Sequence, residues 1–167
     1  MRLRPVTLDD VALYERMRCD PAMMAELGGP VPRESIPAKV ASDVADVETH
    51  GAWIFIAEED DQAVGHVCIW DHDEDGERIT EIGWMVLPEF QGRGLGREAT
   101  RTILDRARAE GCWDVVHAFP GVTNAPSNGV CRSLGFELVG ERAIIGFNDR
   151  PLRANHWRLD LRSATAP

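Results

Sequence analysis

The first fifty residues are patterned as one short strand followed by two helices. Residues 2–6 read as a strand. Thr7, with the acidic Asp10 three positions later, is a capping-box pattern that predicts a helix running through Met17 or beyond. Residues 27–32 are rich in glycine and proline and predict a loop.

A second helix is predicted to begin at Ser35. Pro37 stands in its first turn, where proline is tolerated because the amide hydrogen that it lacks would have no partner there. Valines at helical spacing then give this helix one apolar face. They are Val40, Val44 and Val47.

The middle of the chain is predicted to form three strands in an antiparallel meander. Residues 53–57, 63–70 and 79–87 are the strand-like segments, and acidic turns at 58–61 and 71–77 connect them. Connections this short join antiparallel neighbours, since parallel neighbours need a long crossover.

After Pro88 the pattern changes to helices that alternate with strands. Residues 91–96 form a glycine-rich loop that opens a helix, and Gly111 ends that helix. Its apolar positions keep helical spacing and are Leu95, Ala99, Ile103, Leu104 and Ala107. A strand at 113–119 follows.

The remaining residues predict a short helix at 127–134 and a final hairpin of 138–147 with 154–161. We therefore expect an α/β fold in a single domain over residues 1–167. Its sheet is mixed and mostly antiparallel, with about seven strands and about four flanking helices.

Size and composition agree with one cytoplasmic domain. A chain of 167 residues with 44% hydrophobic residues can bury a core of its own. No apolar run reaches the roughly 18 residues of a membrane span, and no signal peptide opens the chain. The net charge of −10 disfavours nucleic acids and anionic membranes as partners and favours cationic ligands.

No metal site is expected from the residue spacing. The four cysteines, Cys19, Cys68, Cys112 and Cys131, include no Cys-x-x-Cys pair. The five histidines, His50, His66, His72, His117 and His156, show no metal-ligand spacing. Residues 71–76 fit the first half of a calcium loop, but Ile82 stands where that loop needs a glutamate. The alternatives for this segment are a solvated turn and an acidic patch that attracts a cationic acceptor.

The glycine-rich loop is the most informative motif. A helix N-terminus presents unpaired amide groups and partial positive charge, and glycines let a phosphate approach the main chain. Arg93 and Arg97 add positive charge at the same place. Two other interpretations remain: a turn without a ligand, and a dinucleotide fingerprint over residues 94–99 with Asp114 as its acid.

Three blocks in order resemble the GNAT superfamily of N-acetyltransferases. Gln91, Gly94 and Gly96 match its acyl-coenzyme A loop, written Q/R-x-x-G-x-G/A. Residues 81–88 resemble the family's fourth strand, and residues 124–136 resemble its Asn-x-x-Ser/Ala and Leu-Gly-Phe block. The likeness is greatest to the branch that contains the ribosomal-protein N-terminal acetyltransferases.

The resemblance implies acetyl-coenzyme A as co-substrate, bound where the fourth and fifth strands splay apart. The backbone amide of Met85 or Val86 would polarise the thioester, and Asn124 would contact the pantetheine arm. The diphosphate would be held by the loop and the first helical turn, with Gln91, Gly92, Arg93, Gly94, Gly96 and Arg97.

Transfer also needs a base for the amine. Glu81 lies on the same strand face as Gly83 and Met85 and is the candidate, with a structural ion pair as the alternative. Relatives carry a tyrosine as the acid where this chain has Cys131, so Cys131 or Ser127 would protonate the leaving sulfur. Cys131 as a core residue and Ser127 as a helix cap are the alternatives.

The resulting expectation is an N-acetyltransferase that moves an acetyl group to a primary amine by direct attack. The acceptor would be a small molecule or a protein N-terminus, of cationic character. A non-catalytic acyl-coenzyme A sensor is the alternative. The protein would act as a monomer or a homodimer.

Overall fold

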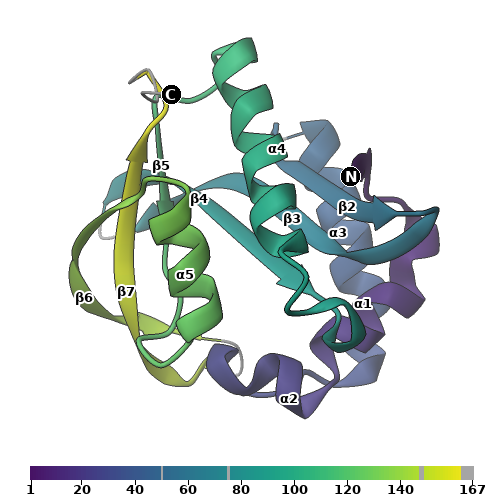
Figure 1. Ribbon diagram of the computed structural model, residues 1–167. Helices are drawn as coiled ribbons and strands as arrows, with labels where there is room; N and C mark the ends of the chain where they lie inside the picture. The colour runs from purple at the N-terminus through teal and green to yellow at the C-terminus, as the bar shows by residue number, and fades with distance from the viewer. Residues whose placement is uncertain (50, 75, 147–148, 163–167) are drawn as a thin grey trace.

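A computed structural model describes residues 1–49, 51–74, 76–146 and 149–162 (Figure 1). The predictions that involve His50, Asp75 and Phe147 fall outside these residues. The strands are β1 (Arg2–Pro5), β2 (Trp53–Glu59), β3 (Gln62–Glu74), β4 (Glu77–Val86), β5 (Val115–Ala118), β6 (Glu137–Ile145) and β7 (Pro151–Asp160). The α-helices are α1 (Val11–Arg18), α2 (Pro21–Met24), α3 (Ile36–Thr49), α4 (Leu95–Glu110) and α5 (Ala125–Ser133).

The seven strands form one mixed sheet in the order β1-β2-β3-β4-β5-β7-β6. Every neighbouring pair is antiparallel except β4 and β5, which run parallel. The predicted α/β fold is therefore confirmed, as are the meander of β2 to β4 and the final hairpin. The short helix α2 lies in a stretch for which no helix was predicted.

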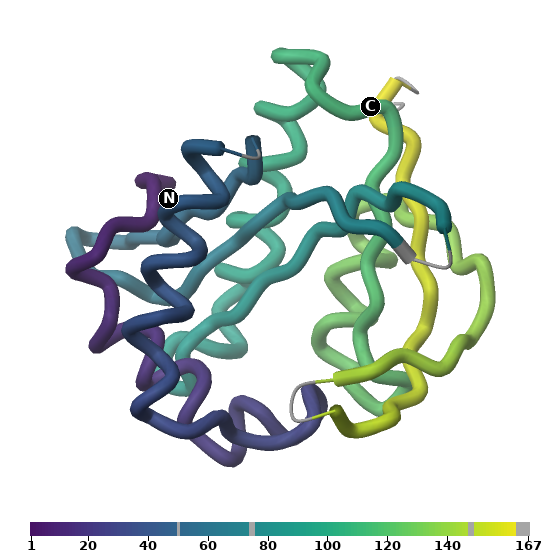
Figure 2. Tube along the Cα trace, turned by 180° about the vertical axis from the view of Figure 1, so that it is seen from behind, coloured from purple at the N-terminus to yellow at the C-terminus, as the bar shows by residue number. Residues whose placement is uncertain are grey.

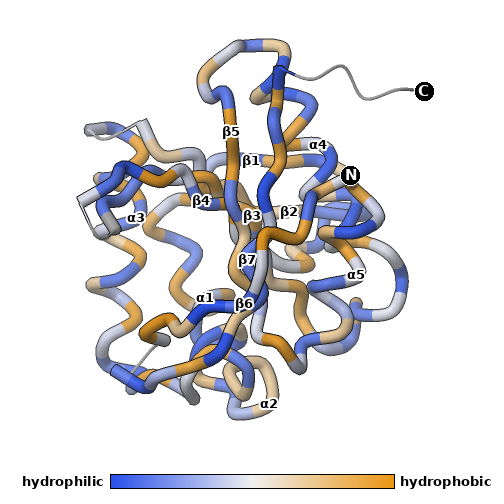
Figure 3. Tube along the Cα trace, turned by 90° about the vertical axis from the view of Figure 1, so that its left-hand side faces the viewer, coloured by the Kyte–Doolittle hydropathy of each residue, from blue (hydrophilic) through white to orange (hydrophobic). Residues whose placement is uncertain are grey.

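Each face of the sheet carries its own core. Alternate residues of a strand point to opposite faces. On β2, accordingly, Ile54 and Ile56 pack with α1 and α3, while Phe55 and Ala57 pack with α4. Figures 1 and 2 show α1 and α3 on one face and α4 and α5 on the other. Burial on both faces makes the strand β2 apolar throughout residues 53–57. Figure 3 colours the chain by hydropathy and shows polar and apolar segments alternating along it.

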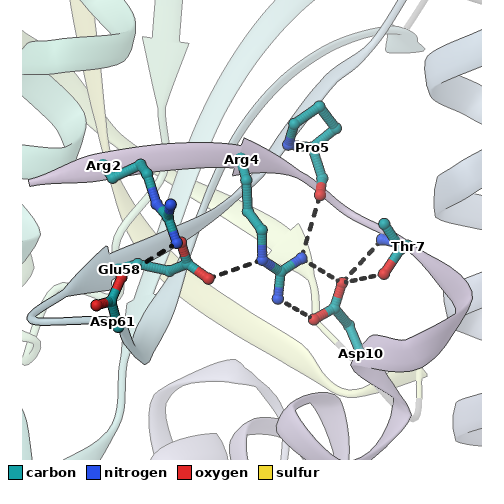
Figure 4. Close-up of polar contacts among 7 residues, drawn as sticks. All are labelled: Arg2, Arg4, Pro5, Thr7, Asp10, Glu58 and Asp61. Carbon is teal, nitrogen blue, oxygen red and sulfur yellow. Dashed lines mark hydrogen bonds and ion pairs between the residues drawn. The ribbon is translucent and has the colours of Figure 1, made fainter.

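The predicted acidic turn after residue 57 is wrong for Glu58. Only Asp60 and Asp61 form the turn, both with positive φ, whereas Glu58 belongs to β2 and is buried. Its carboxylate accepts hydrogen bonds from Arg2 Nε at 2.7 Å and Arg4 Nε at 2.8 Å (Figure 4). Two arginines from the neighbouring strand thus neutralise an acid that would otherwise be solvated.

The capping box at Thr7 is confirmed and extended by Arg4. Asp10 accepts a hydrogen bond from the Thr7 backbone amide at 2.8 Å, and its two oxygens receive the Arg4 guanidinium at 2.6 and 2.8 Å (Figure 4). Burial raises the pKa of Asp10, but the bonds from Arg4 and Thr7 outweigh this and hold the pKa below its ordinary value. This network fixes β1 to the start of the helical segment.

Asp10→Asn is expected to lower the free energy of unfolding by about 2 kcal/mol at neutral pH, because it leaves Arg4 with one carboxylate instead of two. A depressed pKa contributes stability that is present above the unfolded value and lost as pH falls through the folded one. The difference between the variant and wild type should therefore shrink below about pH 4. Denaturant titrations at several pH values measure this. The exposed neighbour variant Asp9→Asn is the control, and an equal loss in both would contradict the prediction.

Candidate functional site

The glycine-rich loop leads directly into α4 and leaves its first turn without a side-chain cap. Gly94 is the N-cap residue and has a left-handed conformation with φ of 79°. As a glycine, it has no side chain that could accept a hydrogen bond from the first-turn amides. Gly92 has φ of 74°, and a Cβ at either glycine would meet nothing within 4 Å. The first-turn amides of α4 therefore lie beside open space that an anion can enter.

Gly96 is needed for a different reason. A Cβ at this position would lie 3.3 Å from Val86 Cγ2, so glycine allows the first turn of α4 to pack against the end of β4. The side chains near the loop are positively charged or polar. Arg97 is exposed, Arg93 pairs with Glu59 at 2.6 Å, and Gln91 donates to the Val86 carbonyl at 2.9 Å.

β4 and β5 separate after a single register pair, that of Glu81 with His117. β4 continues to Val86, whereas β5 ends at Ala118. Figure 1 shows β4 running away from β5 toward the glycine-rich loop. Residues 82–86 of β4 consequently present a backbone edge that β5 does not pair, including Met85 and Val86. Unpaired strand edges offer amide and carbonyl groups to an extended ligand.

Glu81 lies at the point where the two strands part. Glu81 is the register partner of Trp70 on β3. The side chains of Glu81 and Met85 lie on the face of the sheet that α1 and α3 cover. The Oε2 atom of Glu81 lies 3.1 Å from His72 Nε2. The strand position of Glu81 thus places its carboxylate beside the open edge, and the imidazole of His72 lies within hydrogen-bond distance of it.

A histidine pair stands on the other side of the separation. His117 Nδ1 lies 2.8 Å from His156 Nε2, and Phe119 stacks on His117 at 6.4 Å between ring centroids. Burial, followed by the charges of His156, Arg158 and Arg142, lowers the pKa of His117 to about 4. His117 is therefore neutral at physiological pH and can act as a hydrogen-bond partner.

Asn124, rather than Ser127, caps α5. The Asn124 side chain accepts a hydrogen bond from the Ser127 backbone amide at 3.1 Å, and the helix begins at Ala125. The interpretation of Ser127 as a helix cap is therefore wrong, because the cap lies three residues earlier. Ser127 is partly exposed in the first turn of this helix.

Asn128 connects α5 to the sheet. Its amide nitrogen donates to the Gly121 and Asn124 carbonyls at 2.9 and 2.8 Å. Its oxygen accepts from Asn155 at 2.7 Å and from the Trp157 indole at 2.8 Å. All hydrogen-bonding positions of this buried amide are filled, so Asn128 fixes α5 to the sheet.

Cys131 is fully buried in the core between α4, α5 and the sheet. Burial raises the pKa of its thiol to about 12. A packing role suits this environment, because burial disfavours the thiolate that would remain if the thiol gave up its proton.

A cavity of about 710 Å³ lies on the α1 and α3 face of the sheet. Side chains of β3 form one wall, among them Trp70 and His72, and residues of α3 form the other, among them Asp43 and Asp46. His66 lines it as well, and burial lowers the pKa of this histidine to about 3. The cavity thus opens beside the imidazole that contacts Glu81.

The segment read as a half calcium loop belongs mostly to β3. Asp71 accepts hydrogen bonds from Thr80 at 2.6 Å and Arg78 at 3.0 Å across the hairpin. Among the described residues, no three His, Cys, Asp or Glu side chains gather closely enough to hold a metal ion. In the same residues, no helix has the length and apolarity needed to cross a bilayer.

Two features of the site were missed by sequence reasoning. His72 was assigned to a turn, and its contact with Glu81 depends on the register between β3 and β4. The histidine pair depends on the pairing of β5 with β7, which no local signal reveals.

Comparison with known proteins gives one family and several relatives. A family model described as "Acetyltransferase (GNAT) domain" matches residues 1–137. An L-methionine sulfoximine/L-methionine sulfone acetyltransferase of Pseudomonas paraeruginosa is 32% identical over 116 residues. That match covers 68% of this chain and 58% of the relative, so the chain matches little more than half of the relative's length.

Solved structures share the fold over nearly the whole chain. The protein yncA of Salmonella typhimurium, solved with its cofactor acetyl-CoA, has a TM-score of 0.76 and 26% identity, covering 100% of this chain and 97% of its own. A ribosomal-protein-alanine N-acetyltransferase of Brucella melitensis has a TM-score of 0.78 and 22% identity, covering 96% and 99%.

Proposed function

The chain belongs to the GNAT acetyltransferase family, and from that premise we propose that it transfers an acetyl group from acetyl-CoA to a primary amine. The observation that carries the proposal is the juxtaposition of two features. The uncapped N-terminus of α4 at Gly94 lies at the end of the strand whose edge is left open beyond Glu81. Together they provide an anion site and an unpaired backbone edge for one extended ligand.

Acetyl-CoA fits this arrangement and supplies the activated acetyl group. The loop amides with Gln91, Gly92, Gly94 and Gly96 would bind its diphosphate, and Arg93 and Arg97 would add charge-assisted bonds. The open edge at Met85 and Val86 would bind the amide-bearing arm and orient the thioester, and Asn124 would lie near that arm.

Glu81 is the proposed general base. It would remove the proton from the acceptor ammonium so that the neutral nitrogen attacks the thioester directly, without an acyl-enzyme. Ser127 or solvent would protonate the departing sulfur. The buried thiol of Cys131 is a poorer donor, because it lies in the core and has a raised pKa.

The acceptor is proposed to be a small cationic amine or a protein N-terminus. The relatives from Pseudomonas act on L-methionine sulfoximine and L-methionine sulfone, which are small amino-acid derivatives. The net charge of −10 favours a ligand that carries positive charge.

The proposal is tested by measuring coenzyme A release with a panel of amines. The panel contains L-methionine sulfone, spermidine, kanamycin and a peptide with a free N-terminus. We expect release above the rate without amine for at least one of them, and binding of acetyl-CoA by calorimetry. Binding without amine-stimulated release would instead indicate a non-catalytic sensor. Absence of binding would overturn the proposal.

A further inference from the structure

His72 contacts the proposed base but has no part in the mechanism so far. Its Nε2 atom lies 3.1 Å from Glu81 Oε2, within the reach of a hydrogen bond. Its ring stacks on Trp70 with an angle of 28° between the planes and 6.3 Å between the centroids. The ring is thus held by an aromatic neighbour on one side and by a carboxylate at its edge.

The same imidazole lines the cavity on the α1 and α3 face. Glu81 is not among the residues that line this cavity, and lies next to the separation of β4 and β5. The Glu81–His72 pair therefore links the open strand edge to the cavity. Four aspartates and three basic residues line the cavity, and Lys39 pairs with Asp43 and Arg78 with Asp71. The charged lining residues are Asp43, Asp46, Asp71, Asp73, Arg18, Lys39 and Arg78. A space of about 710 Å³ with charged side chains in its walls is large enough for water.

We propose that His72 is a positioning residue that orients Glu81, takes the proton that Glu81 removes from the acceptor amine, and passes it to the cavity. This inference rests on the proposed acetyltransferase function and adds a residue that the function does not itself require. A base that hands its proton onward returns to the carboxylate form for the next turnover.

The protons balance over one reaction. The acceptor ammonium gives one proton to Glu81, which transfers it to Nε2 of the His72 tautomer that carries its hydrogen on Nδ1. The resulting imidazolium releases the Nδ1 proton to water and leaves Nε2–H donating to the Glu81 carboxylate. Proton exchange with water restores the first tautomer before the next turnover. The neutral nitrogen forms the C–N bond as the C–S bond breaks, and the electron pair of that bond goes to sulfur. The nitrogen loses its second proton on becoming an amide, and the sulfur gains one on becoming a thiol. The net product besides amide and thiol is one proton in solution.

The test measures coenzyme A release by His72→Ala with the best amine of the panel, with and without added imidazoles. We expect kcat to fall by about tenfold or more while the acetyl-CoA dissociation constant stays within about twofold of wild type. Imidazole should restore part of the rate, and a series of substituted imidazoles of similar size should rescue better as their basicity rises. An imidazole that merely fills a hole would rescue without regard to basicity.

Glu77→Gln, an exposed position on the same hairpin, is the control and should keep the wild-type kcat. His72→Gln keeps a polar group of similar size and provides the kcat measurement if His72→Ala does not fold. A wild-type kcat in the His72 variants, or rescue independent of basicity, overturns the inference and leaves the acetyltransferase proposal standing. A wild-type protein that releases no coenzyme A with any amine overturns both.

Discussion

Glu81→Gln is expected to lower kcat by about 100-fold while acetyl-CoA binds as in wild type. Glutamine has the shape of glutamate and can still hydrogen bond to His72, but it cannot take up the proton of an ammonium. Coenzyme A release measured between about pH 6 and 9 should show a residual rate that rises with pH, because solution base then replaces the missing carboxylate. Calorimetry with acetyl-CoA checks that binding is intact.

The matched control for this variant is Glu77→Gln, which removes the same charge from the exposed start of the same strand. It should leave turnover within about twofold of wild type, since an exposed charge at this distance is screened by salt. If Glu81→Gln keeps wild-type turnover over the whole pH range, Glu81 takes no part in proton transfer, and the ion-pair interpretation of this residue is correct.

The features of the fold that could be predicted from sequence are those that depend on neighbouring residues. The capping box at Thr7, the apolar face with Val40 and the end of α4 at Gly111 each need only a few consecutive positions. The glycine-rich loop was predictable for the same reason, because Gly92 and Gly94 adopt backbone conformations that other residues rarely do. Its location beside an open strand edge was expected only from the resemblance to the GNAT superfamily.

Features that depend on distant partners could not be predicted. Glu58 stands in an acidic run, and only Arg2 and Arg4 of the adjacent strand explain why it is buried. The hairpin of β3 and β4 extends further than its polar sequence suggests. Cross-strand bonds from Thr80 and Arg78 to Asp71 stabilise this extension.

That longer hairpin has a consequence for the site. With a turn at residues 71–77, His72 would lie in a loop, whereas in the structure it continues β3 and pairs with Ile79. Glu81 lies two residues beyond Ile79 on the same strand face, which brings its carboxylate to the imidazole. The position of a possible proton acceptor was therefore set by strand register, which local pattern does not encode.

Gly94→Asp is expected to weaken acetyl-CoA binding by about 100-fold, measured by calorimetry. Aspartate tolerates the left-handed backbone better than most residues, so the fold should persist. Its carboxylate would stand in the open space at the N-terminus of α4, and would take the place of the diphosphate while repelling it.

Gly111→Asp is the control for backbone strain, because Gly111 caps the other end of α4 with φ of 65° and also has nothing within 4 Å of its Cβ position. Backbone strain should cost each variant about 1 kcal/mol of stability, a loss that the helix dipole reduces at Gly94 and increases at Gly111. Only Gly94→Asp should lose affinity, since the two ends of α4 differ in the sign of the helix dipole and in distance from the open edge of β4. Equal affinity in the two variants would show that the diphosphate binds elsewhere than at the α4 N-terminus, and would remove the observation on which the proposed function depends.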